Sequence, residues 1–156
     1  PGKGTTFTVT VPLKLQNAEN DTFDFSGLRE FRTLIVDDDR SICESTTQML
    51  DEAGIRSEYV LTGIEAVGKV VAAHEMNRDY HFIIIDWKMP EMDGLEATRT
   101  IRNLDREDCK KIPIYAMSAN AFDEDVKRSL ASGMNGHLSK PVNLQVLEKT
   151  LQKVLG

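Results

Sequence analysis

Acidic residues follow two short apolar segments of this 156-residue chain, and their placement points to chemistry. Asp37 and Asp38 come after the segment at 32–36, and Asp86 comes directly after the segment at 83–85. Short apolar segments of this kind are typical of buried parallel strands, whose last residues meet at one edge of the sheet. Carboxylates that meet there repel one another and need a cation, and an all-oxygen set with open positions suits Mg²⁺. The sequence therefore predicts a magnesium site at this edge.

Two further polar residues end apolar segments in the same way. Ser118 follows the segment at 112–117, and Lys140 comes shortly after the segment at 135–138. A lysine ammonium is a mobile point charge that suits a single phosphoryl oxygen. We therefore expect one edge to combine acids, a hydroxyl and an ammonium group, a set suited to handling a phosphoryl group.

The elements that must position these residues alternate along the chain. We expect strands at 32–36, 55–61, 82–85, 112–117 and 135–138, each followed by an amphipathic helix. This alternation specifies an α/β fold, a doubly wound five-stranded parallel sheet with helices on both faces. A flavodoxin-like strand order, 2-1-3-4-5, places the crevice between the first and third strands, which are the two that end in carboxylates.

The helices should turn their apolar faces toward this sheet. Helix starts are expected at Arg40, with Asp39 as cap, and after Thr62, Asp93-Gly94, Asn120 and Asn143. The residues expected to face inward are Ile42, Met49, Leu50 and Ala53; Val67, Val70, Val71 and His74; Ala97, Ile101 and Leu104; Phe122, Val126 and Leu130; and Leu144, Leu147, Leu151, Val154 and Leu155.

The N-terminal part has a different character. Phe7, Val9 and Val11 alternate with threonines, a half-buried strand pattern, and residues 16–30 are polar and acidic like a linker. The stretch Gly2-Lys3-Gly4-Thr5-Thr6-Phe7 resembles the last glycine box of a histidine-kinase ATP-binding domain; the alternative is an edge strand preceded by a glycine turn. The resemblance implies that residues 1–15 are the terminal strand of such a domain, truncated and unable to bind ATP, and that the chain is part of a longer protein.

Composition excludes several classes of function. The formal net charge of −6 argues against nucleic acid as a direct partner, because binding to phosphates needs a basic face. No apolar run approaches the roughly 20 residues that cross a bilayer, so we expect no membrane contact by this segment; an anchor of the parent would lie outside it. Cys43 and Cys109 lack the spacing of a metal site, which favours a reduced, cytoplasmic chain.

Residues 31–156 resemble a response-regulator receiver domain over their whole length. The resemblance rests on Asp37-Asp38, on Asp86 in the loop Asp-Trp-Lys-Met-Pro-Glu-Met-Asp-Gly, on Ser118, and on Lys140 in Ser-Lys-Pro. It implies that Asp86 accepts a phosphoryl group from a phosphohistidine with the help of Lys140.

The resemblance also implies roles for backbone and neighbouring groups. Mg²⁺ would be held by Asp37, Asp38, Asp86 and the backbone carbonyl of Lys88. Ser118 would be the switch hydroxyl, and His137 occupies the place, three residues before the lysine, where the family usually has Tyr or Phe.

The implied function is phosphorelay signalling within a hybrid histidine kinase. The donor would be the kinase domain, in cis, and the group would pass to a histidine phosphotransfer protein. Lacking an ATP site and a donor histidine, this segment would catalyse only its own phosphotransfer and dephosphorylation. Two alternatives stay open: a phosphatase of the haloacid-dehalogenase type, whose Asp-x-Asp-x-Thr/Val motif is half matched at Asp37 to Ser41, and a receiver-like interaction domain that is never phosphorylated.

Overall fold

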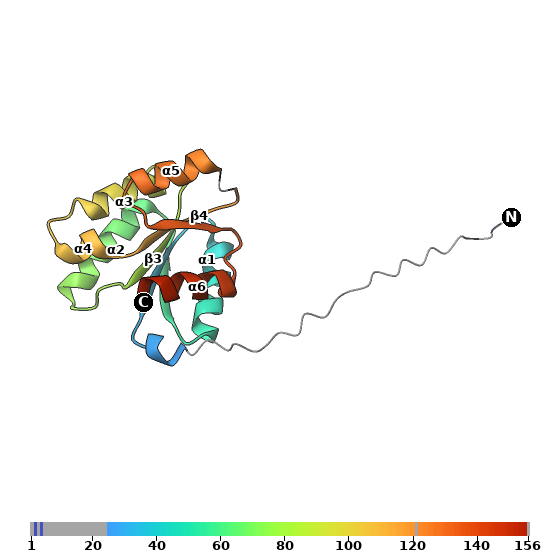
Figure 1. Ribbon diagram of the computed structural model, residues 1–156, viewed down its shortest axis with the longest axis horizontal. Helices are drawn as coiled ribbons and strands as arrows, with labels where there is room; N and C mark the ends of the chain where they lie inside the picture. Colours follow the sequence, from blue (N-terminus) through green and yellow to red (C-terminus); the bar gives the residue numbers. More distant parts are fainter. Residues whose placement is uncertain (1, 3, 5–24, 121, 156) are drawn as a thin grey trace.

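The computed structural model describes residues 2, 4, 25–120 and 122–155. Its centre is a parallel sheet of five strands, β1 (Arg32–Val36), β2 (Arg56–Val60), β3 (Phe82–Asp86), β4 (Ile114–Ser118) and β5 (Gly136–Ser139) (Figure 1). The strand order is β2-β1-β3-β4-β5, so the expected α/β fold class and the flavodoxin-like order are confirmed. The expected strand at Phe7 to Val11 lies outside the described residues, as does most of the expected linker.

The apolar segments form the middle of the sheet because they are buried on both faces. Every residue of β3 is buried, and Ile83, Ile84 and Ile85 have no exposed surface. Alternate residues of a strand point to opposite faces, so Ile83 and Ile85 join one core cluster while Ile84 joins the other. Continuous burial is what makes these segments apolar throughout rather than alternating.

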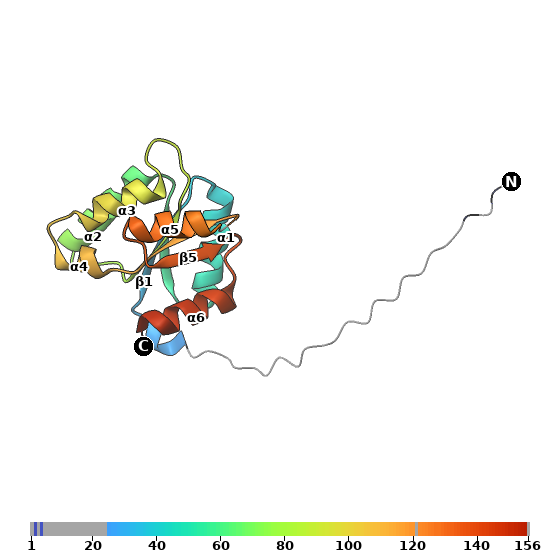
Figure 2. The ribbon, with the colours of Figure 1, turned by 45° about the horizontal axis from the view of Figure 1, so that its top comes forward.

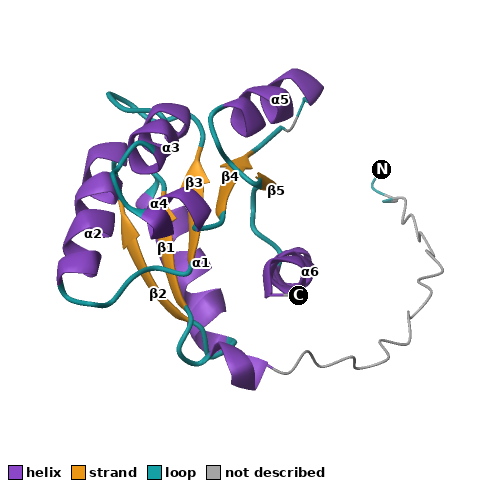
Figure 3. Ribbon diagram, turned by 60° about the vertical axis from the view of Figure 1, so that its left-hand side comes forward, coloured by secondary structure: helices purple, strands orange, loops and turns teal. Residues whose placement is uncertain are grey.

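Helices cover both faces, as the right-handed crossovers require. The first core cluster packs under α2 (Gly63–Glu75), α3 (Gly94–Arg102) and the short α4 (Glu107–Lys111). The second packs under α1 (Arg40–Glu52) and α6 (Leu144–Leu155), which Figure 3 shows on the other side of the strands. Helix α5 (Asp123–Ala131) lies over β5 at the edge of the sheet (Figure 2).

Several expected inward positions are wrong. His74 is exposed at the end of α2, because the buried stripe of that helix runs through Ala66, Val70 and Ala73. Phe122 and Leu130 are 67% and 50% exposed. Helix α5 buries Ser129 instead.

This burial of Ser129 is possible because its hydroxyl donates a hydrogen bond to the Asp125 carbonyl, one turn back in the same helix. The apolar positions at 122 and 130 therefore do not define the packed side of α5.

Two short elements were not expected from the sequence. Helix α4 has only five residues, too few for an apolar period to show, and it is anchored by the buried Cys109. A 3₁₀-helix at Phe25–Leu28 lies within the segment expected to be a linker. Leu28 is 3% exposed and packs with Phe31 in the second core cluster. The last part of that segment is therefore docked on the sheet domain.

Glu58, the middle residue of β2, joins that strand to its neighbours. Its carboxylate accepts hydrogen bonds from Arg32 Nη2 at 2.6 Å, Tyr80 Oη at 2.9 Å and Lys69 Nζ at 3.3 Å. Burial raises the pKa of Glu58, but these three donors outweigh burial and hold its pKa below the ordinary value of 4.5.

This shift predicts a pH-dependent effect of Glu58→Gln on stability. Because the folded pKa lies below the unfolded one, the charged carboxylate stabilises the fold above pH 4.5, and this contribution is lost as the pH falls through the folded pKa. The side chain is 42% exposed, so we expect a loss of less than about 1 kcal/mol at pH 7. Urea unfolding should therefore show a smaller loss at pH 4 than at pH 7. Glu52→Gln, whose carboxylate is exposed and bonded to the neutral Gln48 amide, is the control; an equal effect of both variants would contradict the prediction.

Candidate functional site

Three acidic residues leave β1 together but have different surroundings. Asp37 has no exposed surface, and its Oδ1 accepts a hydrogen bond from the Asp39 amide at 2.9 Å. Asp39 caps α1, since its Oδ1 accepts from the Ser41 amide at 2.9 Å, as the sequence predicts. Asp38 is exposed. The side chain that serves the helix is therefore distinct from the two aspartates expected to hold a cation.

Lys140 connects Asp37 with the end of β3. Its Nζ lies 2.6 Å from Asp37 Oδ2 and 3.2 Å from Asp86 Oδ2. Burial lowers the pKa of Lys140, but its contact with Asp37 and the charge of Asp86 outweigh burial, so the pKa lies above its usual value. Burial raises the pKa of Asp86; Lys140 opposes this rise and Asp37 adds to it, and the net shift is upward. One ammonium thus serves two buried carboxylates.

The acids form a group that fits a hard divalent cation. Asp37, Asp38 and Asp86 each offer a carboxylate oxygen, and these oxygens lie within 4.8 Å of one another. The buried Asp37 Oδ2 faces the Lys140 ammonium at 2.6 Å and has no other donor among the described residues. An all-oxygen donor set of two buried carboxylates and one exposed carboxylate suits Mg²⁺, which keeps several waters.

The loop after β3 holds Asp86 in place. The Lys88 amide lies 3.4 Å from Asp86 Oδ1, and the Gly94 amide donates to the Trp87 carbonyl at 3.1 Å. Asp93 caps α3 by accepting from the Glu96 amide. A Cβ atom at Gly94 would collide with the Asp86 carbonyl and lie 2.9 Å from Trp87 Cα. The glycine is therefore required for the close approach of α3 to the end of β3.

A cleft of about 270 Å³ opens beside Asp86. Lys88, Ser118, Asn120 and Lys140 line it. Trp87, Phe122 and Asp125 line it too, and these were not expected at the site. The signal for Trp87 was its place next to Asp86. No sequence signal marks Phe122 and Asp125, because they reach the cleft only through the way the start of α5 packs.

The hydroxyl expected as a switch makes two contacts. Ser118 Oγ lies 3.0 Å from the Asn120 carbonyl oxygen and 2.6 Å from His137 Nε2. Burial lowers the pKa of His137, against an opposing effect of the Asp125 charge. The structure thus brings Ser118 and His137 into direct contact at the edge of the cleft.

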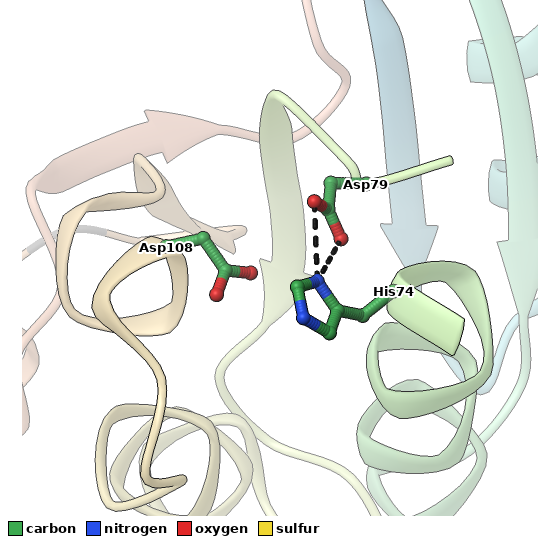
Figure 4. Close-up of side chains that lie close together, drawn as sticks. All are labelled: His74, Asp79 and Asp108. Carbon is green, nitrogen blue, oxygen red and sulfur yellow. Dashed lines mark hydrogen bonds and ion pairs between the residues drawn. The ribbon is translucent and has the colours of Figure 1, made fainter. Parts of the chain in front are cut away.

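A second cluster of possible ligands lies on the α2–α4 side of the molecule (Figure 4). His74 Nδ1 lies 3.0 Å from Asp79 Oδ1, and Asp108 faces the same ring. Arg106 pairs with both acids, at 3.3 Å from Asp79 and in a closer contact with Asp108. Because a guanidinium already supplies positive charge to both carboxylates, this cluster is an ion-pair network that ties α2 to α4.

A parallel sheet in this order, with an acidic cleft where β1 and β3 end, defines a receiver-type signalling domain. In agreement, the family model described as "Response regulator receiver domain" matches residues 33–152, and the chain belongs to that family. No helix in the part of the chain that the structure describes is long and apolar enough to cross a membrane.

The curated relatives that this chain matches include histidine kinases, one of them a hybrid kinase, and a sensor protein. It is 37% identical over 121 residues to the osmosensing histidine protein kinase SLN1 of Saccharomyces cerevisiae, covering 77% of this chain and 10% of that protein. It is 31% identical over 159 residues to the sensor protein EvgS of Escherichia coli K12 (99% and 12%). It is 34% identical over 130 residues to hybrid signal transduction histidine kinase G of Dictyostelium discoideum (82% and 4%). The chain therefore spans an eighth or less of each of these three relatives.

Two solved structures extend the likeness. The receiver domain of the histidine kinase CKI1 from Arabidopsis thaliana, complexed with Mg²⁺ and BeF₃⁻, matches with a TM-score of 0.73 and 30% identity, covering 85% of this chain and 94% of that one. The second is a co-crystal structure of the Saccharomyces cerevisiae histidine phosphotransfer protein Ypd1 with the receiver domain of the response regulator Ssk1. It matches with a TM-score of 0.67 and 27% identity, covering 79% of this chain and 87% of that one.

The close approach at Gly94 predicts the effect of Gly94→Ala. The added methyl group must displace the Asp86 carbonyl, so we expect a loss of about 1–3 kcal/mol in the free energy of unfolding and weaker Mg²⁺ binding, measured by urea unfolding and by Trp87 fluorescence. Gly68→Ala is the matched control, because a Cβ there meets nothing within 4 Å on an exposed helix position; it should stabilise by about 0.5–1 kcal/mol. Equal effects at both glycines would contradict the prediction.

Proposed function

We propose that this chain is the receiver of a hybrid histidine kinase and accepts a phosphoryl group on Asp86. The observation that carries the proposal is the shared ammonium. Lys140 lies between the buried Asp37 and Asp86, and both Lys140 and Asp86 line the cleft. In phosphoryl transfer the protein mainly positions the reacting groups and neutralises the charge on the phosphoryl oxygens. A carboxylate at the end of a strand, next to a lysine ammonium, is suited to this role.

Asp86 is the nucleophile in this proposal. One of its carboxylate oxygens attacks the phosphorus of a phosphohistidine, the P–N bond breaks, and the imidazole leaves with a proton from water. Lys140 neutralises a phosphoryl oxygen, and Ser118 moves to hydrogen-bond the new group. Asp37 is a poorer candidate nucleophile, because it has no exposed surface and its two oxygens already contact the Asp39 amide and Lys140. This favours the receiver over the phosphatase reading.

Mg²⁺ belongs to the same proposal. Asp37, Asp38 and Asp86 would hold it with the backbone carbonyl of Lys88, and it would neutralise charge on the transferred group. Support comes from the grouped carboxylate oxygens of Asp37, Asp38 and Asp86 and from the family member that was solved with Mg²⁺ and BeF₃⁻.

The proposed partners are the kinase domain of the same protein, as donor, and a histidine phosphotransfer protein, as acceptor. A groove of about 480 Å³ between α1 and the residues after β5 adjoins the site and shares Ala119 and Lys140 with it. Ile42 and Met49 supply apolar walls. A partner helix seated there would bring its histidine to Asp86.

The output of the switch would be the surface near β4 and β5. Helix α5 follows Ser118 closely and exposes Phe122 and Leu130, the apolar side chains that do not pack on the sheet. We place the domain in the cytoplasm, since its two cysteines are free and buried. Residues 1–15 as the end of a kinase ATP-binding domain and 16–30 as its linker remain part of the proposal.

The adduct provides the direct test. Incubation with a labelled phosphoryl donor and Mg²⁺ should give an acid-stable, base-labile adduct that Asp86→Asn abolishes. Asp39→Asn should leave it intact, because that side chain caps α1 and asparagine caps equally well. Adduct formation by Asp86→Asn, or none by the wild type with any donor, would overturn the proposed function.

The groove predicts a selective effect of Ser45→Arg. Ser45 is exposed on α1 and lines the groove, so a bulky cation there should lower phosphotransfer to or from a histidine phosphotransfer protein about tenfold. Phosphorylation by acetyl phosphate, which needs no docking, should not change. Gln48→Arg, also exposed on α1 but outside the groove, is the control. Equal transfer rates for both variants would place the partner elsewhere.

A further inference from the structure

Ser118 and His137 come from neighbouring strands and meet on one face of the sheet. The register pairs Ser118 with Ser139 and Ala116 with His137, so Ser118 and His137 are diagonal neighbours. A diagonal pair is within reach of a long side chain such as histidine. The 2.6 Å contact between Ser118 Oγ and His137 Nε2 is therefore fixed by the pairing of β4 with β5.

The hydrogen atoms of this contact can be assigned by counting. A serine hydroxyl has one hydrogen, and Ser118 directs it to the Asn120 carbonyl oxygen, a group that can only accept. Nε2 of His137 must then be the donor to Ser118 Oγ. His137 is accordingly in its Nε2–H form, with Nδ1 bare.

The other ring nitrogen agrees with this assignment. His137 Nδ1 is buried and has no hydrogen-bond partner among the described residues. Protonation there would bury an N–H group without an acceptor, which costs more than a modest hydrogen bond gains. Burial lowers the pKa of this imidazole, although the charge of Asp125 opposes the effect. His137 is thus kept as a neutral single donor.

We infer that His137 acts as a latch on the switch hydroxyl: its Nε2–H holds Ser118 toward β5 and the Asn120 carbonyl until a phosphoryl group forms on Asp86. The inference rests on the proposed function. To bond a phosphoryl oxygen, Ser118 redirects its only hydrogen from the Asn120 carbonyl, and in the latch the movement of its Oγ toward Asp86 breaks the contact with the imidazole. His137 is therefore a positioning residue that opposes the switch by the strength of one hydrogen bond. A Phe at this place would offer no such bond.

The hydrogen-bond form can be measured without any phosphorylation. Imidazole nitrogen NMR of the ¹⁵N-histidine-labelled chain at pH 7, with the His137 signals assigned by their loss in His137→Gln, should show a protonated Nε2 and an unprotonated Nδ1. An Nδ1–H tautomer or an imidazolium would overturn the latch whatever the fate of Asp86.

The opposing effect is measured with beryllofluoride, a phosphoryl mimic, and Mg²⁺. Its affinity follows from the fluorescence of Trp87, the single tryptophan, which lines the cleft. His137→Phe should bind about fivefold more tightly, the factor expected for one net hydrogen bond. His137→Gln, whose amide can still donate to Ser118, should stay within about twofold of the wild type.

Two controls separate the latch from other causes. In a Ser118→Ala background, His137→Phe should have no further effect, and thermal unfolding of each variant checks that the fold is intact. Equal affinities of the wild type and His137→Phe, or equal gains in the Phe and Gln variants, would overturn the latch while leaving the proposed function standing. If the wild type binds no beryllofluoride, the proposed function is wrong and the latch falls with it.

Discussion

The charge balance around Lys140 is the constraint on which the rest of the site depends. Three carboxylates and one ammonium leave a formal charge of −2 at the end of β1 and β3. Asp37 is fully buried and Asp86 nearly so, and uncompensated charge is costly in such surroundings. The single lysine keeps the carboxylates together without neutralising them. The remaining charge is the physical reason for a divalent cation at this place.

The opposite end of the same strands has no such surplus. Near the amino end of β1, Arg32 and Lys69 both face Glu58, so two cations serve one acid. In the cluster of His74, Asp79 and Asp108, one guanidinium, that of Arg106, faces two half-buried carboxylates, so the surplus of these three groups is only −1. Acidic residues alone therefore do not mark the site. The carboxyl ends of β1 and β3 stand out because the surplus of negative charge there is larger and because Asp37 and Asp86 are buried.

The sequence predicts those features of the fold and site that follow from the pattern of apolar residues, and misses those that depend on individual side-chain contacts. The convergence of Asp37, Asp86, Ser118 and Lys140 was predictable, because parallel strands end at one edge and each residue ends an apolar segment. Helix α4 was not, since five residues show no period. The packed side of α5 was misjudged because Ser129 satisfies its own hydroxyl and Leu130 does not point inward. A pattern of apolar residues cannot predict that a serine is buried.

The contact of Ser118 with His137 is a functional feature that the sequence alone could not predict. A resemblance to the family marks position 137 as part of the switch, but it does not say which atoms meet. That depends on the register of β4 with β5 and on the Asn120 carbonyl, which takes the hydroxyl hydrogen and leaves the imidazole as donor. A phenylalanine ring at this position can only occupy space, whereas an imidazole also forms a hydrogen bond that breaks when the switch turns. The identity of one side chain can thus change how strongly the unphosphorylated state is favoured while the phosphoryl chemistry stays the same.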